Sequence, residues 1–363
     1  MKVPSLDKYI GIEVYCTDFD GIGGKIKFDD ESFIVEEIIR DIKSNANGYA
    51  LYRLEKHGID TQHVIEDIKK KHGINVKPFG LKDAHAITTQ YVIAMRKGYY
   101  KEVKEENYSL RFVCYTEPLS KDVLLANKFS VMIKEHRGNL DVLENIDKCT
   151  IANFYGYQRF GSSKAITHLI GREIVKKNFH AAIDLLLMNN MDFEVAVRRE
   201  YEKSKDPIKA LRKIPIRIRR LYVEAYKSYI FNKVMSYIVE EGYELKCKNG
   251  DVCFVNNRLK IFDGGDAILA IPTSGYGFRN KSRFSLVIEK VMKEEGVTHK
   301  DFYIKDMQEV SSESNFRQAL LIFKDFSYKK EPLILNFILQ KGGYATILLR
   351  EIMKPSDPAM AGF

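Results

Sequence analysis

The chain changes texture twice along its length, and this change constrains its fold more than any other feature. Short β-rich runs dominate the first part, and we predict strands at 34–39, 50–54, 91–95, 110–115 and 129–133. One helix, capped by Asp60 or Thr61 and ended by Gly73, is expected among these strands. From 164 to about 237 the pattern is helical, and from 251 to 270 it returns to strands. The sequence therefore predicts an α+β organisation.

Length and charge narrow the class of protein. A chain of 363 residues with 45% hydrophobic composition is long enough for about two domains and a substantial core. It has 58 Lys and Arg against 49 Asp and Glu, which gives a net charge of +9. This excess favours an anionic partner such as nucleic acid.

Cysteine spacing and hydropathy exclude other classes. The five cysteines show neither CxxC spacing nor a paired framework, and no His cluster could complete a zinc site, so we predict no metal and free thiols in a reducing cytosol. The N-terminus lacks the apolar run of a secretory signal, and no segment approaches the ~18 to 20 apolar residues of a membrane span. We expect a soluble, cytoplasmic protein with no membrane partner.

The segment GLKDAHAITTQ, at 80–90, is the strongest indication of chemistry. Residues 80–89 should be a loop between a short strand at 74–79 and another at 90–96, and functional groups collect in loops that a rigid scaffold holds. Asp83 lies there among a glycine, a lysine and hydroxyls. From the residues alone, an aspartate in such a loop is more often a turn or helix-cap residue.

Four segments in order resemble motifs of one family. The segment at 80–90 resembles the GxKDxxAxTxQ signature of the TruD family of tRNA pseudouridine synthases, and NFYGYQRFG at 153–161 resembles the family's NxFGxQRFG. Near the end, GGYATILLRE at 342–351 is similar to GS(Y/F)AT...RE, and near the start KFDDESFIVEE at 27–37 is similar to K...(E)xFxVxE. Tyr155 and Gly343 depart from the usual Phe and Ser. A weaker echo, SYIFN, lies at 228–232.

This resemblance implies a fold. The family has a pseudouridine synthase core, a mixed and mostly antiparallel sheet with flanking helices, interrupted by an inserted α/β TRUD-type domain. The motifs here lie on both sides of the helical middle of the chain. We therefore expect a catalytic domain formed by 1–175 plus 312–363, and an inserted domain at 176–311.

The resemblance also implies the reaction. The family converts a uridine of tRNA, at position thirteen, to pseudouridine, and the aspartate of the signature, Asp83 here, is its catalytic nucleophile. The reaction needs no cofactor and no metal. A carboxylate can attack the sugar C1′ or the base C6, or can lead a 2′-proton abstraction, and the sequence leaves all three routes open.

Charged residues of the motifs are expected near the nucleophile. Asp83 must be ionised, and a basic neighbour favours that form. Lys27 is the first candidate, and Lys82 and Arg350 follow it. Glu31 of the opening motif is a further candidate substrate-binding residue. The alternatives are a turn residue for Glu31 and, for Arg350, an ordinary solvated pair with its neighbour.

Other motif residues suit a base that leaves its stack. A uridine inside folded RNA must be flipped out and then held by stacking and edge hydrogen bonds. Tyr344 corresponds to the family's aromatic that lies against the target base, and Phe33 and Tyr155 would complete an apolar wall. The Asn153 amide suits the uracil edge or the orientation of Asp83. Otherwise Phe33 is a core residue and Asn153 a cap or turn residue.

The densest basic run lies between 203 and 220 and holds eight Lys or Arg. RNA contact outside the active site should be electrostatic and shape-based, so this run could be a phosphate track. The alternative is a solvated helix face. The candidate RNA-backbone residues are Arg212, Lys213, Arg217, Arg219 and Arg220.

Two other functions remain open. A non-catalytic tRNA-binding protein or RNA chaperone could use the same scaffold, although the intact signature argues against it. A hydrolase with paired carboxylates would require a second acid, such as Glu36 or Glu37, near Asp83. We expect tRNA as the partner of a monomer that needs no obligate protein partner.

Overall fold

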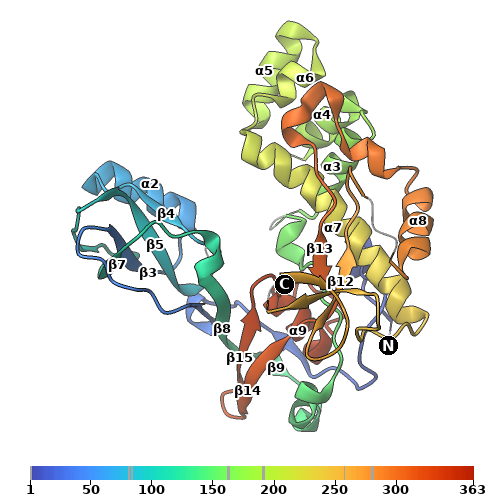
Figure 1. Ribbon diagram of the computed structural model, residues 1–363, viewed down its shortest axis with the longest axis horizontal. Helices are drawn as coiled ribbons and strands as arrows, with labels where there is room; N and C mark the ends of the chain where they lie inside the picture. The colour runs from blue at the N-terminus through green and yellow to red at the C-terminus, as the bar shows by residue number, and fades with distance from the viewer. Residues whose placement is uncertain are drawn as a thin grey trace. The chain divides into compact units, whose positions relative to one another are not determined.

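The structure is a computed structural model that describes residues 2–80, 82, 85–161, 164–189, 193–256, 258–278 and 282–363. The chain folds into two compact units, and Figure 1 labels many of their elements. The unit that we call the helical unit contains Met1–Asp18, Thr150–Leu321 and Thr346–Glu351. The other, the sheet unit, contains Phe19–Cys149, Ile322–Ala345 and Ile352–Phe363.

The sheet unit is built on one large sheet, which has nine strands among the described residues. Its strand order is β14-β15-β8-β2-β5-β3-β7-β6, and β4 pairs with β5 beside that path. Only β2 and β5 pair in parallel within the described part of this sheet, with Ile34 opposite Ile87. The mixed, mostly antiparallel sheet expected from the sequence is therefore present. The strands are β2 (Phe33–Ile39), β3 (Tyr49–Lys56), β4 (Val76–Pro78), β5 (Ile87–Lys97), β6 (Val103–Lys104), β7 (Tyr108–Thr116), β8 (Leu124–Met132), β14 (Phe323–Lys329) and β15 (Ile334–Gln340).

The helix predicted in this unit is confirmed as α2 (Thr61–His72). The Asp60 carboxylate accepts hydrogen bonds from two backbone amides of its first turn, and Gly73 ends it in the left-handed region with a φ of 68°. Val64 and Ile68 lie on one face and share a buried core with side chains of β3 and β5. The smaller elements of the unit are β1 (Gly23–Lys25), which pairs with β9 (Lys134–His136), and the 3₁₀ turns η1 (Asp30–Ser32), η2 (Lys121–Val123), η3 (Leu140–Glu144) and η4 (Ile146–Lys148).

The helical unit is organised around one long helix, α7 (Ile216–Glu240). Pro215 precedes its first turn, as predicted, because proline has the fixed φ that a helix start needs. Helices α3 and α8 pack against α7, which explains why residues all round it are buried. The other helices are α1 (Ser5–Tyr9), α3 (Thr167–Val175), α4 (Phe179–Met188), α5 (Glu194–Ser204), α6 (Pro207–Leu211), α8 (Ser285–Glu294), and the 3₁₀ turns η5 (Tyr157–Arg159), η6 (His299–Phe302) and η7 (Lys305–Val310).

The predicted return to strands is confirmed in a second sheet, with the order β11-β10-β12-β13. Its strands are β10 (Val252–Val255), β11 (Arg258–Ile261), β12 (Ile268–Pro272) and β13 (Phe316–Gln318). Cys247, before β10, and Cys253, within it, form a disulfide, where we had expected free thiols. The intervening turn brings their Cα atoms to 6.7 Å, within the reach of a disulfide.

The compact units divide the chain at other points than the predicted domains. Residues 150–175 and 312–321 pack with the helical middle, and α9 (Ala345–Met353) contributes residues to both units. The predicted division into 1–175 plus 312–363 and 176–311 was based on motif positions, whereas the units are based on packing. The predicted domains therefore remain a prediction.

Candidate active site

The strongest motif covers the loop between β4 and β5 and the first residues of β5. Asp83 lies outside the described residues. Its neighbour Lys82 is fixed by the start of α2, because the Lys82 amide donates to Thr61 Oγ1 at 2.9 Å. The Thr61 hydroxyl lies 2.8 Å from Gln90 Oε1, and Gln90 Nε2 donates to the Gly80 carbonyl at 3.4 Å. The final glutamine of the motif thus helps to hold the loop in place.

The Lys82 side chain makes a second attachment. Its Nζ lies 2.6 Å from Glu37 Oε1, and the other Glu37 oxygen accepts from the Tyr91 amide at 2.9 Å. The Glu37 side chain is fully buried and that of Lys82 is 11% exposed. A Cβ on Gly80 would lie 2.9 Å from Glu37 Oε1, so a larger residue there would displace this carboxylate. Lys82, predicted beside Asp83, has its ammonium bound by Glu37.

Lys27 and Phe33, which belong to the opening motif, lie together in the sheet unit. Lys27 has a φ of 52°, and its Nζ lies 4.9 Å from the centre of the Phe33 ring. Phe33 is 5% exposed and packs edge-on against Phe129, which stacks on Phe337. The aromatic ring is therefore anchored in the core while a cation lies over it.

Glu31 and Tyr344 also belong to the sheet unit. Glu31 is exposed in η1, which Asp29 caps through a hydrogen bond from the Ser32 amide at 2.7 Å. Tyr344 is half-buried, directly before α9. The turn before it uses Gly342 at a φ of 91°, and the Gly343 amide donates to the Gln340 carbonyl at 3.0 Å. The turn sets the position of Tyr344 between β15 and α9.

Asn153, from the second motif, is 3% exposed in the helical unit. Its Nδ2 donates to the Gln318 carbonyl at 3.1 Å, and its Oδ1 accepts from Arg317 at 2.8 Å. These two contacts define the orientation of the amide, because the oxygen faces a donor and the nitrogen an acceptor. Each of the two atoms has the capacity for one more hydrogen bond.

Tyr155 is supported by the segment at 228–232, which weakly resembles the family. Its amide donates to Asn232 Oδ1 at 2.8 Å, and its carbonyl accepts from Asn232 Nδ2 at 3.1 Å. The Tyr155 ring packs edge-on against Phe231 at 5.5 Å, and the Arg317 guanidinium lies 3.9 Å from its centre. The sequence pattern indicated no role for 228–232 and did not reveal Arg317, which belongs to none of the motifs.

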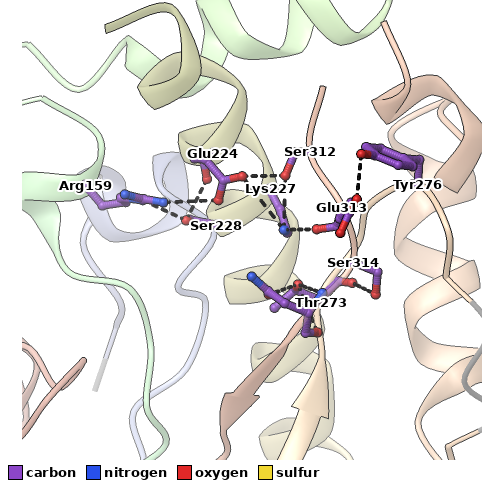
Figure 2. A network of polar contacts seen from close by, with 10 residues as sticks. Arg159, Glu224, Lys227, Ser228, Thr273, Tyr276, Ser312, Glu313 and Ser314 are labelled. Carbon is purple, nitrogen blue, oxygen red and sulfur yellow. Dashed lines mark hydrogen bonds and ion pairs between the residues drawn. The ribbon is translucent and has the colours of Figure 1, made fainter. Parts of the chain in front are cut away.

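A polar network of the helical unit joins Arg159 of the second motif to α7 (Figure 2). Arg159 Nε donates to Ser228 Oγ at 3.0 Å, and its Nη2 lies 3.5 Å from Glu224. Glu224 accepts from the Ser312 hydroxyl, and Lys227 Nζ donates to Ser312 Oγ at 3.1 Å. Burial lowers the pKa of Lys227. The network fixes the motif, the long helix and the chain before β13 to one another.

Arg350 is fully buried in the helical unit. Its Nε lies 2.5 Å from Asp7, its Nη1 2.8 Å from Glu351, and its Nη2 donates to the Val14 carbonyl at 2.9 Å. Burial acts to lower the pKa of Arg350, but the two carboxylates outweigh it and hold the pKa above its ordinary value. The solvated pair considered from the sequence is wrong, because this guanidinium lies in the core.

Three of the five predicted RNA-backbone residues in the basic run bind Glu309. Arg219 is 7% exposed, and its guanidinium binds Glu309 and the Ile214 carbonyl. Arg212 and Arg220, although exposed, also bind Glu309, the former through the carboxylate and the latter through the carbonyl. The other two predicted RNA-backbone residues, Lys213 and Arg217, are exposed, and Lys213 pairs with Glu200 at 3.0 Å.

Within the described ranges, no group of three or more His, Cys, Asp or Glu side chains could hold a metal ion. No helix in the same ranges is long and apolar enough to cross a membrane.

Comparison with known proteins relates the whole chain to one group. A family model described as tRNA pseudouridine synthase D (TruD) matches residues 9–201 and 186–352. A probable tRNA pseudouridine synthase D from Pyrococcus furiosus is 31% identical over 403 residues, which cover 94% of this chain and 98% of the relative. One from Pyrobaculum arsenaticum is 29% identical over 417 residues, with all of both chains covered. A crystal structure from Methanosarcina mazei, described as a putative tRNA pseudouridine synthase D (TruD), has a TM-score of 0.76 and 25% identity over 99% of this chain and 100% of that one.

Proposed function

Because the chain belongs to the TruD family of tRNA pseudouridine synthases, we propose that it isomerises a uridine of tRNA to pseudouridine. The observation that carries the proposal is the signature loop. It contains Asp83, the carboxylate that the reaction needs. On either side of this residue, Lys82 is bonded to Thr61 and Glu37, and Gln90 is bonded to Thr61. Covalent catalysis requires a scaffold of this kind around its nucleophile.

The reaction exchanges one bond to the sugar for another. The C1′–N1 bond of uridine breaks, the uracil turns within the site, and a C1′–C5 bond forms. C5 loses its hydrogen to solvent, and N1 ends with a proton. Asp83 acts as the nucleophile, at C1′ or C6, or leads the glycal route.

The other motif residues have roles in binding the flipped uridine. Tyr344 stacks on the base, and Phe33 forms part of the apolar wall. Lys27, whose ammonium lies over Phe33, is the first candidate for the cation that favours an ionised Asp83. Glu31 is exposed and is proposed to contact the substrate.

Two of the candidate site residues have structural roles in this proposal. Lys82 holds the loop through Glu37, and Arg350 holds the N-terminal segment through Asp7. In the helical unit, Asn153 and Tyr155 remain proposed substrate contacts, of which Asn153 has a fixed amide.

We further propose that the target is position thirteen of tRNA and that the protein acts in the cytoplasm as a monomer without an obligate protein partner or cofactor. The net charge of +9 supports a polyanionic substrate.

The hydrolase alternative is disfavoured by Glu37. The two oxygens of this carboxylate bind the Lys82 ammonium and the Tyr91 amide, so both already have hydrogen-bond partners within the fold. Glu36, the other acid considered, pairs with Arg53 at 3.5 Å.

Tritium release distinguishes a synthase from a non-catalytic tRNA-binding protein. We expect the purified protein to release tritium to water from tRNA that contains 5-tritiated uridine, because C5 loses its hydrogen when it bonds to the sugar. Mapping pseudouridine in tRNA from cells that lack the protein should show one uridine left unmodified. Tight tRNA binding without tritium release would instead support the RNA chaperone.

A further inference from the structure

Arg317 makes an unusual set of contacts with the segment 153–155 of the helical unit. It lies in β13, where Ile271 of β12 is its strand partner, so its backbone is held by a sheet. From there its Nε donates to the Asn153 carbonyl at 2.8 Å, and its Nη2 donates to Asn153 Oδ1 at 2.8 Å and to the Phe154 carbonyl at 3.1 Å.

The same guanidinium stacks on Tyr155. Its Cζ lies 3.9 Å from the ring centre, which is within the range of a cation–π contact. Phe231 packs edge-on against the Tyr155 ring, and Asn232 binds the Tyr155 backbone on both sides. Arg317 therefore contacts both of the residues that are proposed to bind the substrate from this segment.

Only an arginine can make this set of contacts at once. Its guanidinium is planar, presents five donors in a rigid fork and stacks on aromatic faces, whereas lysine offers a compact ammonium on a flexible stem. The contact with Oδ1 also decides which way the Asn153 amide faces, and Gln318 completes that choice by accepting from Nδ2.

We infer that Arg317 is a positioning residue of the synthase: it fixes the Asn153 amide and the Tyr155 ring in the orientation that the flipped uridine meets. The inference rests on the proposed function. Arg317 acts through its neighbours, and a small error in their placement lowers turnover more than it lowers tRNA affinity, which depends mainly on phosphate contacts.

Arg317→Lys tests this, with Arg283→Lys as the matched control. Arg283, in the same unit, also lies over an aromatic ring, that of Phe284, at 4.6 Å, and donates to two backbone carbonyls, those of Glu244 and Lys246. We expect Arg317→Lys to lower kcat on the order of 10- to 100-fold with KM for tRNA nearly unchanged. Arg283→Lys should keep the wild-type kcat.

A double-mutant cycle with Asn153→Ala separates positioning from a general effect on the fold. If Arg317 acts through Asn153, Asn153→Ala should lower kcat much less in the Arg317→Lys background than in the wild type. Effects that multiply independently, or a wild-type kcat for Arg317→Lys, would overturn the inference and leave the proposed function intact. Absence of tritium release by the wild-type protein would overturn the proposed function, and the inference with it.

Should Arg317→Lys not fold, as judged by circular dichroism and thermal unfolding, Arg317→Gln takes its place with the same expectations, because glutamine keeps donors for part of the contacts. If neither variant folds while Arg283→Lys does, Arg317 is a residue of fold stability, and the positioning role is wrong.

Discussion

The Glu37 carboxylate is wholly buried, with one oxygen 2.6 Å from the Lys82 ammonium and the other 2.9 Å from the Tyr91 amide. Such a pair resists substitution, because loss of one partner leaves a buried charge uncompensated, at a cost of about 3 to 5 kcal/mol. The same argument applies to the buried Arg350 guanidinium, which pairs with Asp7 and Glu351. Lys82 and Arg350 were predicted from the motifs as substrate-binding residues, but these contacts give them structural roles.

Protonation of the buried His168 should make the stability of the fold depend on pH. Its ring stacks on Tyr229 and meets Tyr9 and Phe160 edge-on, and burial lowers its pKa from 6.5 to about 4, with Arg172 adding to the effect. Between these values the unfolded chain binds a proton that the folded chain does not, so stability falls as the pH falls through this window. From pH 7 to pH 5 the loss should be about 2 kcal/mol.

Urea unfolding at pH 7 and pH 5 measures this loss. His168→Gln, which does not titrate in the window, should lose about 2 kcal/mol less than the wild type between the two pH values. The exposed His180→Gln serves as the control and should keep the wild-type difference. Equal pH dependence in the wild type and His168→Gln would show that this histidine is not the cause.

At the scale of helices and strands, the sequence predicted most where the determinants are local. The α2 boundaries followed from Asp60 and Gly73, and the α7 start followed from Pro215, because caps and fixed φ angles act within one turn. The start of β5 at Ile87 was not predicted, since it depends on parallel pairing with Ile34, a contact distant in sequence. Arg317 was not predicted either, because its contacts with Asn153 are also distant in sequence.

The basic run around α6 and α7 yields a prediction at this scale. If Lys213 and Arg217 contact phosphates, changing both to Gln should weaken binding of all tRNAs alike and flatten the salt dependence by roughly one log-log unit for each phosphate interaction removed. Turnover at saturating tRNA should survive. Arg219→Gln is the contrast: it should lower thermal stability, because it breaks the pair between the buried Arg219 and the half-buried Glu309, and leave the salt slope unchanged.

Binding measured from low to high salt decides between these outcomes. An unchanged slope in the Lys213 and Arg217 double variant would mean that the run is only a solvated face. A collapse of saturated turnover with binding intact would mean that part of this segment acts in the chemistry.

At the scale of the whole molecule, the family followed from four motifs spread over most of the chain and the α+β fold from its alternating β-rich and helical stretches, but the packing units followed from neither. Motif residues fall in both units: Lys27, Phe33, Lys82 and Tyr344 in the sheet unit, and Asn153 in the helical unit. The order of motifs along a chain indicates shared ancestry. Compact units depend instead on which faces of helices and sheets pack together, and motif residues do not reveal this. In the proposed function, the chemistry nevertheless depends on one carboxylate, that of Asp83.

Asp83→Asn, assayed for tritium release from tRNA containing 5-tritiated uridine, tests that claim most directly. The substitution removes the charge and hardly changes the shape, so we predict release at background level with tRNA affinity nearly unchanged. Asp122→Asn makes the same chemical change at a side chain that is 86% exposed in the same unit and should keep full activity. Appreciable release by Asp83→Asn would contradict the account, because the carboxylate could not then be the nucleophile.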